Sequence, residues 1–163
     1  MATQAVKNTH RQIFIDVSGG GETATYERLG EGVTDFTPSA NPTVETKHYI
    51  NASSPTHKIS ATERQYSFSA DVIKGDPCLD YIASLDGKTG DEVDTYMIDV
   101  DASGTGTSGS YPAKRYAITI SLEQPYSIEG GANQVMSGTF YANGDPIEGT
   151  FNTSTKTFTE KSA

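Results

Sequence analysis

The densest group of potential ligand oxygens in the sequence is the run Asp99-Val-Asp101-Ala-Ser103-Gly104. Aspartates at alternate positions before a glycine are typical of the start of a calcium-binding loop. An EF-hand loop also requires a glutamate at its twelfth position and a helix on each side, but that position is Ser110 and the flanking residues have strand patterns. We interpret the segment as a strand that ends in a solvated turn, while a calcium site with looser geometry near Asp99 and Asp101 stays an open alternative.

Two glycine-rich segments and three histidines are the other candidates for binding chemistry. Ser18–Gly21 and the segment 104–109 lack the following helix and the lysine of a phosphate-binding loop. His10, His48 and His57 do not have the i, i+4 spacing of a helical zinc site. His48 and His57 could meet across a hairpin, but the sequence marks no third ligand. We therefore predict no cofactor-binding residues and no metal-binding residues.

Cys78 is the only cysteine, so the chain cannot form an internal disulfide. It lies at the start of a predicted helix, where a thiolate would be stabilised, but its neighbour is Leu79 and we expect a small core residue. The sequence has no G-x-S-x-G motif, and its carboxylates are scattered. We predict no catalytic residues and hence a protein that is not an enzyme.

Chain length and net charge limit the number of domains and the kinds of partner that we expect. The 163 residues favour one domain, 1–163, and the net charge of −9 would repel a phosphate backbone. No apolar run approaches the roughly 20 residues of a membrane span, and the first residues lack the apolar stretch of a signal peptide. We expect a protein made in a cytoplasm that binds neither membrane nor specific nucleic acid.

Apolar residues alternate along most of the chain, which is the pattern of half-buried strands. Strands are predicted over residues 13–17, 26–29, 57–73, 96–100, 116–122, 137–142 and 147–151. Asn143-Gly144-Asp145 predicts a hairpin between the last two of these strands. Asp76 and Pro77 predict the start of one short helix, which Gly87 and Gly90 end. Residues 30–57 have little periodicity and are predicted as a long loop or hairpin.

These elements predict a mainly β fold, with two antiparallel sheets forming a sandwich or barrel and one flanking helix. The order of several weak motifs then resembles the major tail protein, or tail tube protein, of long-tailed, non-contractile bacteriophages. The matching residues are Tyr26–Gly32, Phe36, Asn41-Pro42, Glu45, Lys47, Tyr49–Asn51, Asp71–Pro77, Asp80–Ile82, Gly138–Phe140, Gly144–Pro146, Gly149–Asn152 and Phe158-Thr159.

The resemblance implies a structural virion protein. Members of this family form hexameric rings that stack into a tube around a tape-measure protein, and the tube meets tail terminator and distal tail proteins. The tube delivers DNA into the host, and an acidic wall would let the DNA slide through the lumen without specific binding. The implied location is the virion tail, after synthesis in the host bacterial cytoplasm.

The family's contacts between rings correspond here to an extended N-terminal arm (1–12), the long loop 30–57 and a C-terminal arm (152–163). Within the long loop, Phe36, Tyr49 and Ile50 are the candidate subunit-interface residues, because few residues usually dominate an interface. A different class of function is the alternative: a β-sandwich binding module, such as a carbohydrate-binding or adhesin-like domain. The absence of tryptophan from the sequence disfavours it.

Overall fold

The computed structural model describes residues 3–104 and 106–162, so residues 1, 2, 105 and 163 of the expected arms and glycine-rich loop lie outside the described part. The described residues form ten strands, one α-helix and two short 3-10 helices. In order they are η1 (Asn8–His10), β1 (Arg11–Asp16), β2 (Tyr26–Leu29), β3 (Val33–Ser39), β4 (Pro42–Lys47), β5 (Thr56–Thr62), β6 (Gln65–Asp71), α1 (Pro77–Ala83), η2 (Gly90–Val93), β7 (Asp94–Asp101), β8 (Ser110–Gln124), β9 (Val135–Asn152) and β10 (Thr157–Glu160).

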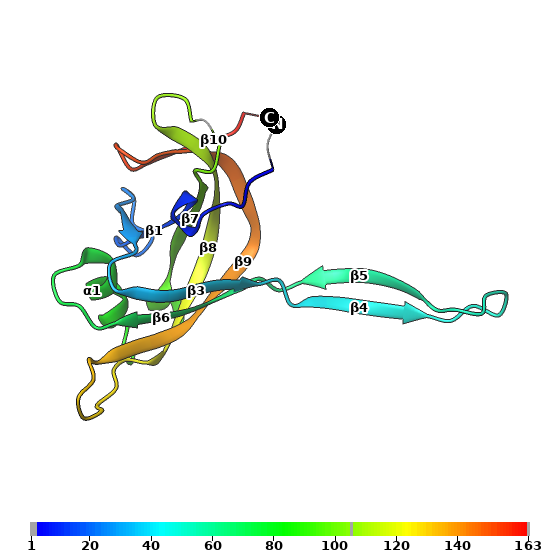
Figure 1. The fold of residues 1–163 in the computed structure, drawn as a ribbon, viewed down its shortest axis with the longest axis horizontal. Helices are drawn as coiled ribbons and strands as arrows, with labels where there is room; N and C mark the ends of the chain where they lie inside the picture. Colours follow the sequence, from blue (N-terminus) through cyan, green and yellow to red (C-terminus); the bar gives the residue numbers. More distant parts are fainter. Residues whose placement is uncertain (1–2, 105, 163) are drawn as a thin grey trace.

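Eight strands form one curled antiparallel sheet in the order β2-β1-β7-β8-β9-β6-β3, with β10 also paired to β9 (Figure 1). The long strands β8 and β9 run side by side through the bend of the sheet. The two remaining strands, β4 and β5, pair only with each other among the described elements. This arrangement confirms the predicted mainly β fold with one helix and a long hairpin.

The main core fills the inside of the curled sheet. Alternate residues of the strands point inward, as a period of two requires. Among them, Ile15, Met97, Ile118 and Phe140 are fully buried. Helix α1 covers this core with Cys78, Leu79 and Ile82. The sheet therefore needs the helix to exclude water from its interior.

A second, smaller core lies on the opposite face of β1 and β7. Phe14 of β1 packs on Phe151 of β9 with ring centroids 4.5 Å apart, and Tyr26 meets Phe151 edge-on at 5.8 Å. Phe158 of β10 covers this cluster from outside. The end of the sheet thus folds back over its beginning, which produces the two layers of a sandwich from one continuous ladder.

Local signals placed the helix correctly. The Asp76 side chain accepts a hydrogen bond from the Leu79 backbone N–H at 2.9 Å, and Pro77 is the first helical residue. The helix has seven residues, so it is stable only because its apolar face is buried.

The predicted hairpin at residues 143–145 is wrong. These residues lie inside the single strand β9, and residues on both sides of them pair with β8. Arg115 pairs with Ile147 and Ala117 with Asn143, so two extra residues of β9 form a bulge here. Gly144 has a φ of 73°, which suits a bulge as well as a turn.

The predicted strand 57–73 is two strands that belong to different sheets. β6 carries the alternation expected there, with Tyr66, Phe68 and Ala70 buried, and it pairs with β3 and β9. Every residue of β5 is exposed. The chain passes from one sheet to the other at residues 63–64, where neither strand assignment continues.

Candidate assembly surfaces

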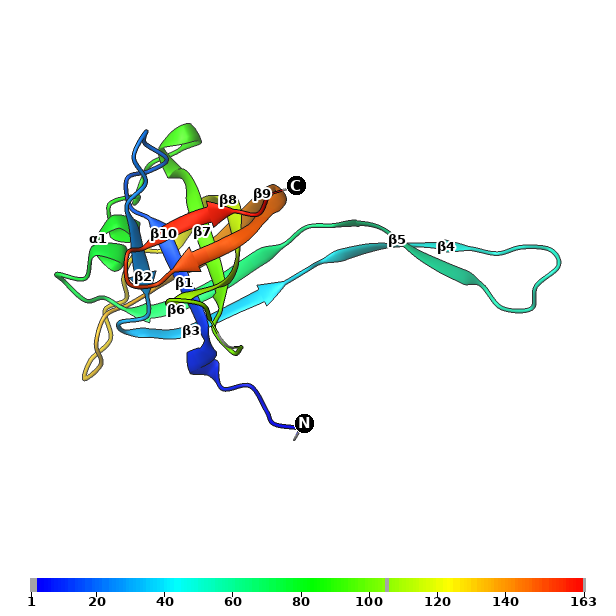
Figure 2. The same ribbon diagram turned by 90° about the horizontal axis from the view of Figure 1, so that it is seen from above.

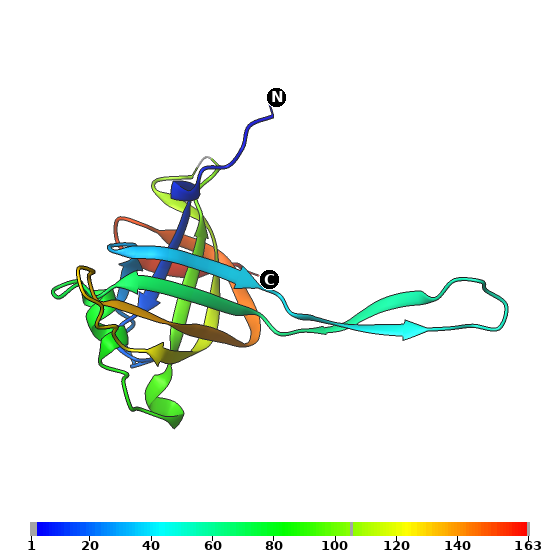
Figure 3. The ribbon, with the colours of Figure 1, turned by 60° about the horizontal axis from the view of Figure 1, so that its bottom comes forward.

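We call the curled eight-stranded sheet and its helix the barrel. The β4–β5 hairpin projects from the barrel as a long arm (Figures 2 and 3). We call residues 40–63 the arm. At its base the Glu63 N–H donates to the Ala40 carbonyl oxygen at 2.9 Å, and the Asn41 side-chain amide donates to the Glu63 carbonyl oxygen at 3.2 Å. Asn41 has a φ of 41°, a conformation that asparagine tolerates better than most residues. These contacts fix the point where the ladder leaves the body.

Cross-strand pairs are the contacts that order the arm. Glu45 lies opposite Lys58, Thr46 lies opposite His57, and the Thr46 hydroxyl and the His57 Nδ1 are 3.1 Å apart. Val44 lies opposite Ile59, and both apolar side chains are exposed, to 52% and 62%. An isolated two-stranded hairpin is marginal in water. An apolar pair on such an arm is a feature that a partner surface could bury.

The three candidate interface residues are not brought together. Tyr49 and Ile50 lie at the tip of the arm, where Tyr49 is half exposed and Ile50 is fully exposed. Phe36 lies in β3 on the barrel, and its ring packs on Tyr66 at 5.2 Å and on Phe140 at 5.6 Å. Phe36 therefore contributes to the core of its own chain, whereas the tip residues leave apolar surface exposed.

The curled sheet ends in open strand edges. Within the described part of the chain, β2 pairs only with β1, β3 only with β6, and β10 only with β9. Unpaired backbone groups on such edges are a template for pairing with another chain. The 157–160 portion of the expected C-terminal arm is β10 itself, and residues 11–12 of the expected N-terminal arm pair with β7.

An open cavity of about 700 Å³ lies at one end of the barrel, beside the base of the arm. We call it the mouth. Apolar residues including Ile13, Phe36 and Ala113 line its wall, together with the rings of Tyr66 and Tyr116. Its charged residues are Arg11, Arg64, Asp99, Asp101, Lys114, Glu148 and Lys161.

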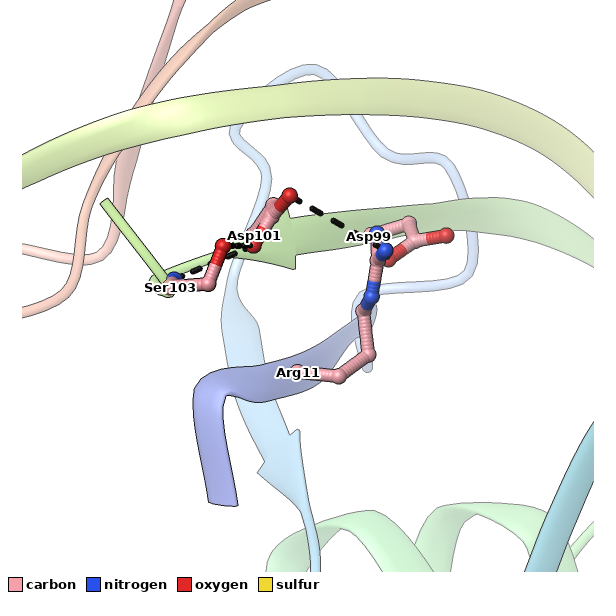
Figure 4. A network of polar contacts seen from close by, with 4 residues as sticks. All are labelled: Arg11, Asp99, Asp101 and Ser103. Carbon is pink, nitrogen blue, oxygen red and sulfur yellow. Dashed lines mark hydrogen bonds and ion pairs between the residues drawn. The ribbon is translucent and has the colours of Figure 1, made fainter. Parts of the chain in front are cut away.

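The two aspartates of the suspected calcium loop are held by protein groups (Figure 4). Arg11 Nη1 lies 3.0 Å from Asp99 Oδ1, and Arg11 Nη2 lies 4.0 Å from Asp101 Oδ2. Ser103 donates to Asp101 Oδ1 from its hydroxyl at 2.6 Å and its backbone N–H at 3.0 Å. These hydrogen bonds lower the pKa of Asp101. The arrangement is that of an ion pair and a capped turn.

No group of three or more His, Cys, Asp or Glu residues in 3–104 and 106–162 is placed to hold a metal ion. Cys78 is buried in the main core, and its burial raises the pKa of the thiol. This is the environment of a small core residue and not of a reactive thiolate.

Among the described residues, no helix is long and apolar enough to cross a membrane.

Some functional candidates were not identified from the sequence. The pair Val44–Ile59 was not predicted because residues 57–73 were interpreted as one half-buried strand, whereas Ile59 lies off the alternation that continues through Phe68. Arg64 was missed because a single arginine beside a strand carries no motif. Only the fold brings it to the mouth.

Several solved chains share this fold, and two of them belong to assemblies with six-fold symmetry. A chain in the tail of an empty GTA particle, obtained by helical refinement with C6 symmetry, has a TM-score of 0.63 and 12% identity, over 87% of this chain and 97% of that one. A chain in the six-fold symmetrised baseplate of the anti-feeding prophage has a TM-score of 0.54 and 9% identity, over 91% of this chain and 97% of that one. No family model and no curated protein sequence matched the chain. At these identities the likeness establishes the fold.

Proposed function

We propose that this chain is a structural virion protein, the subunit of a phage tail tube built from stacked hexameric rings. The observation that carries the proposal is the exposed arm on a barrel of this fold. The arm holds Val44, Ile59, Tyr49 and Ile50 in water, and the subunit offers no surface of its own to cover them within the described residues. The two similar structures come from assemblies with six-fold symmetry.

Self-association would cover the exposed arm and would pair the open strand edges. A repeated contact in which different surfaces of two copies meet closes into a ring or continues as a filament. β2, β3 and β10 each have an unpaired edge in the described subunit, and a neighbour can satisfy those edges. In a stack of rings, the arm of one subunit lies on the body of a subunit in the next ring.

The proposed role of the tube is passage of DNA into a host cell. The tape-measure protein would occupy the lumen before the DNA, and terminator and distal tail proteins would close the two ends. The net charge of −9 favours a lumen wall that does not hold the phosphate backbone. A gel-shift assay at physiological salt is expected to give no complex with duplex DNA, and tight binding would contradict this part of the proposal.

Electron microscopy of the concentrated protein tests the proposal directly. Rings or tubes with six-fold symmetry are the expected result, and sedimentation velocity should show species much larger than a monomer. If the chain stays monomeric at high concentration, over a range of salt and in the presence of its tail initiator proteins, the proposed function is wrong.

A further inference from the structure

The mouth holds positive charge that its own subunit does not neutralise. Arg11 pairs with Asp99 and Asp101, and Lys114 lies 4.0 Å from Glu148. In the part of the chain that the structure describes, Arg64 and Lys161 form no ion pair. In a chain of net charge −9, such cations are well suited to meet an acidic surface.

Arg64 also covers a buried donor. Its guanidinium carbon lies 6.0 Å from the ring centroids of both Tyr66 and Tyr116. Tyr66 is 1% exposed, and its hydroxyl has no hydrogen-bond partner among the described residues. A buried hydroxyl without a partner costs free energy. The Tyr66 hydroxyl is therefore shielded from solvent, and the exposed guanidinium of Arg64 is the donor that the mouth presents to a partner.

The opposite end of the barrel is acidic. Asp86, Asp91 and Glu92 are exposed in the segment from α1 to η2, where Lys88 is the one cation. We call this segment, residues 86–92, the acidic end. Figure 3 shows η2 and η1 at opposite ends of the barrel.

Strand β7 links the two surfaces. η2 directly precedes Asp94 at its start, and Asp99 and Asp101 at its other end line the mouth. A strand of this length spans about 23 Å at 3.3 Å per residue. The acidic end of a subunit therefore cannot reach its own mouth, and any pairing of the two must join different copies.

We propose that the mouth of one subunit receives the acidic end of a second copy, with Asp91 and Glu92 binding Arg64 and Lys161 in a head-to-tail contact. This inference rests on the proposed function, because it specifies one contact of the self-association. Because the mouth and the acidic end are different surfaces, the contact between them is heterologous. It therefore repeats head to tail from copy to copy, as in a ring or filament.

Charge reversal tests the contact. The mouth variant is Arg64→Glu/Lys161→Glu, and the acidic-end variant is Asp91→Lys/Glu92→Lys. Each variant alone would bring like charges together, so its critical concentration for assembly is expected to rise by about tenfold or more. An equimolar mixture is expected to assemble again, because each altered surface then faces an opposite charge and the unaltered surfaces still match. Sedimentation velocity and electron microscopy give the readout.

Lys74→Glu and Glu129→Lys are charge controls, because both residues are exposed and neither lines the mouth or belongs to the acidic end. They are expected to assemble like the wild type. Restoration by mixing also excludes a folding defect, since two misfolded variants would not repair each other. Wild-type assembly with unchanged assembly of both variants, or a mixture that stays dissociated while both variants melt cooperatively, overturns this inference alone. A wild-type chain that never assembles overturns it together with the proposed function.

Discussion

Val44 and Ile59 face each other across the β4–β5 ladder, on an arm whose other side chains are also exposed. Directly opposed residues in an antiparallel pair lie on the same face, so the two side chains form one apolar patch. Monomeric proteins expose single apolar residues routinely, but a matched apolar pair on a projecting hairpin is the kind of patch found at the centre of protein interfaces.

The double variant Val44→Ser/Ile59→Ser is expected to abolish assembly and to leave the barrel intact. The side chains contact no core residue, so the free energy of unfolding of the monomer should change by no more than about 0.5 kcal/mol. The control is Glu45→Ser/Lys58→Ser, the adjacent cross-strand pair, which faces the other side of the arm. Equal loss of assembly in both variants would show that the arm acts through its backbone and not through this patch.

Removal of the arm should separate assembly from folding. Residues 41–62 can be replaced by an Asn-Gly turn, because Ala40 and Glu63 already approach each other across the ladder. We expect cooperative melting at close to the wild-type temperature and no tubes. A deletion that begins earlier in the chain and removes the end of β3 would damage the core, because Phe36 and its neighbours pair with β6. Loss of cooperative melting after the 41–62 replacement would mean that the arm belongs to the folding unit.

Phe36 and Tyr49 are expected to respond oppositely to alanine substitution. Phe36→Ala removes a ring that stacks on Tyr66 and meets Phe140 edge-on, and it should destabilise the monomer by about 2–3 kcal/mol. Tyr49→Ala and Ile50→Ala should change stability by less than about 0.5 kcal/mol and weaken assembly instead. Urea denaturation of the monomer together with sedimentation of the assembled protein distinguishes the two outcomes. A stable Phe36→Ala monomer that fails to assemble would return Phe36 to the interface.

The fold was predictable wherever a local signal had a single structural solution. Asp76-Pro77 is followed by apolar residues at helical spacing, which together predict a helix start, and the alternation around Tyr66 and Phe68 places one face of β6 in a core. Asn143-Gly144 had two solutions. A hairpin and a bulge both use glycine with positive φ, and the choice depends on whether the flanking segments pair with each other or with a third strand. Here the third strand is β8, in which Ala117 pairs with Asn143, 26 positions later in the sequence.

The candidate surfaces were harder to predict than the fold. The low periodicity of residues 30–57 predicted a long loop or hairpin. The exposure of the arm, however, depends on where β4 and β5 leave the main sheet. That point is set by Ala40, Asn41 and Glu63, which have no recognisable motif. The mouth is assembled from residues between Arg11 and Lys161, so only the closed fold brings them together.

Hydrogen exchange should show different protection along one ladder in the unassembled subunit. Amides of β6 that pair with β3 and β9 lie over the core and should exchange only on global unfolding, whereas amides of β4 and β5 should exchange fast. Assembly should slow exchange in β4 and β5, because a neighbouring subunit would cover the arm. Protection of the arm that is the same in monomer and tube would contradict a role in contacts between subunits.

Because of Cys78, we expect the free energy of unfolding to fall as the pH rises through the alkaline range. Burial in the core, followed by the nearby charges of Asp76 and Glu27, raises the pKa of the thiol in the folded chain. Above about pH 8.5 the unfolded chain loses the thiol proton while the folded chain keeps it. The folded state then binds more protons, so the free energy of unfolding falls as pH rises, by up to about 1.4 kcal/mol per pH unit.

Cys78→Ala removes this contribution but keeps the raised pKa of Tyr66, which burial also causes and which is common to both proteins. The stability advantage of the wild type over the variant should therefore shrink by up to about 2 kcal/mol between pH 8.5 and pH 10. Urea denaturation of the monomer at several pH values measures it, and parallel pH profiles would show that the thiol reaches solvent in the folded state. A thiol reagent gives an independent control: in the native protein at pH 8 it should label Cys78 only as fast as the barrel opens, and fast labelling would contradict the burial on which the prediction depends.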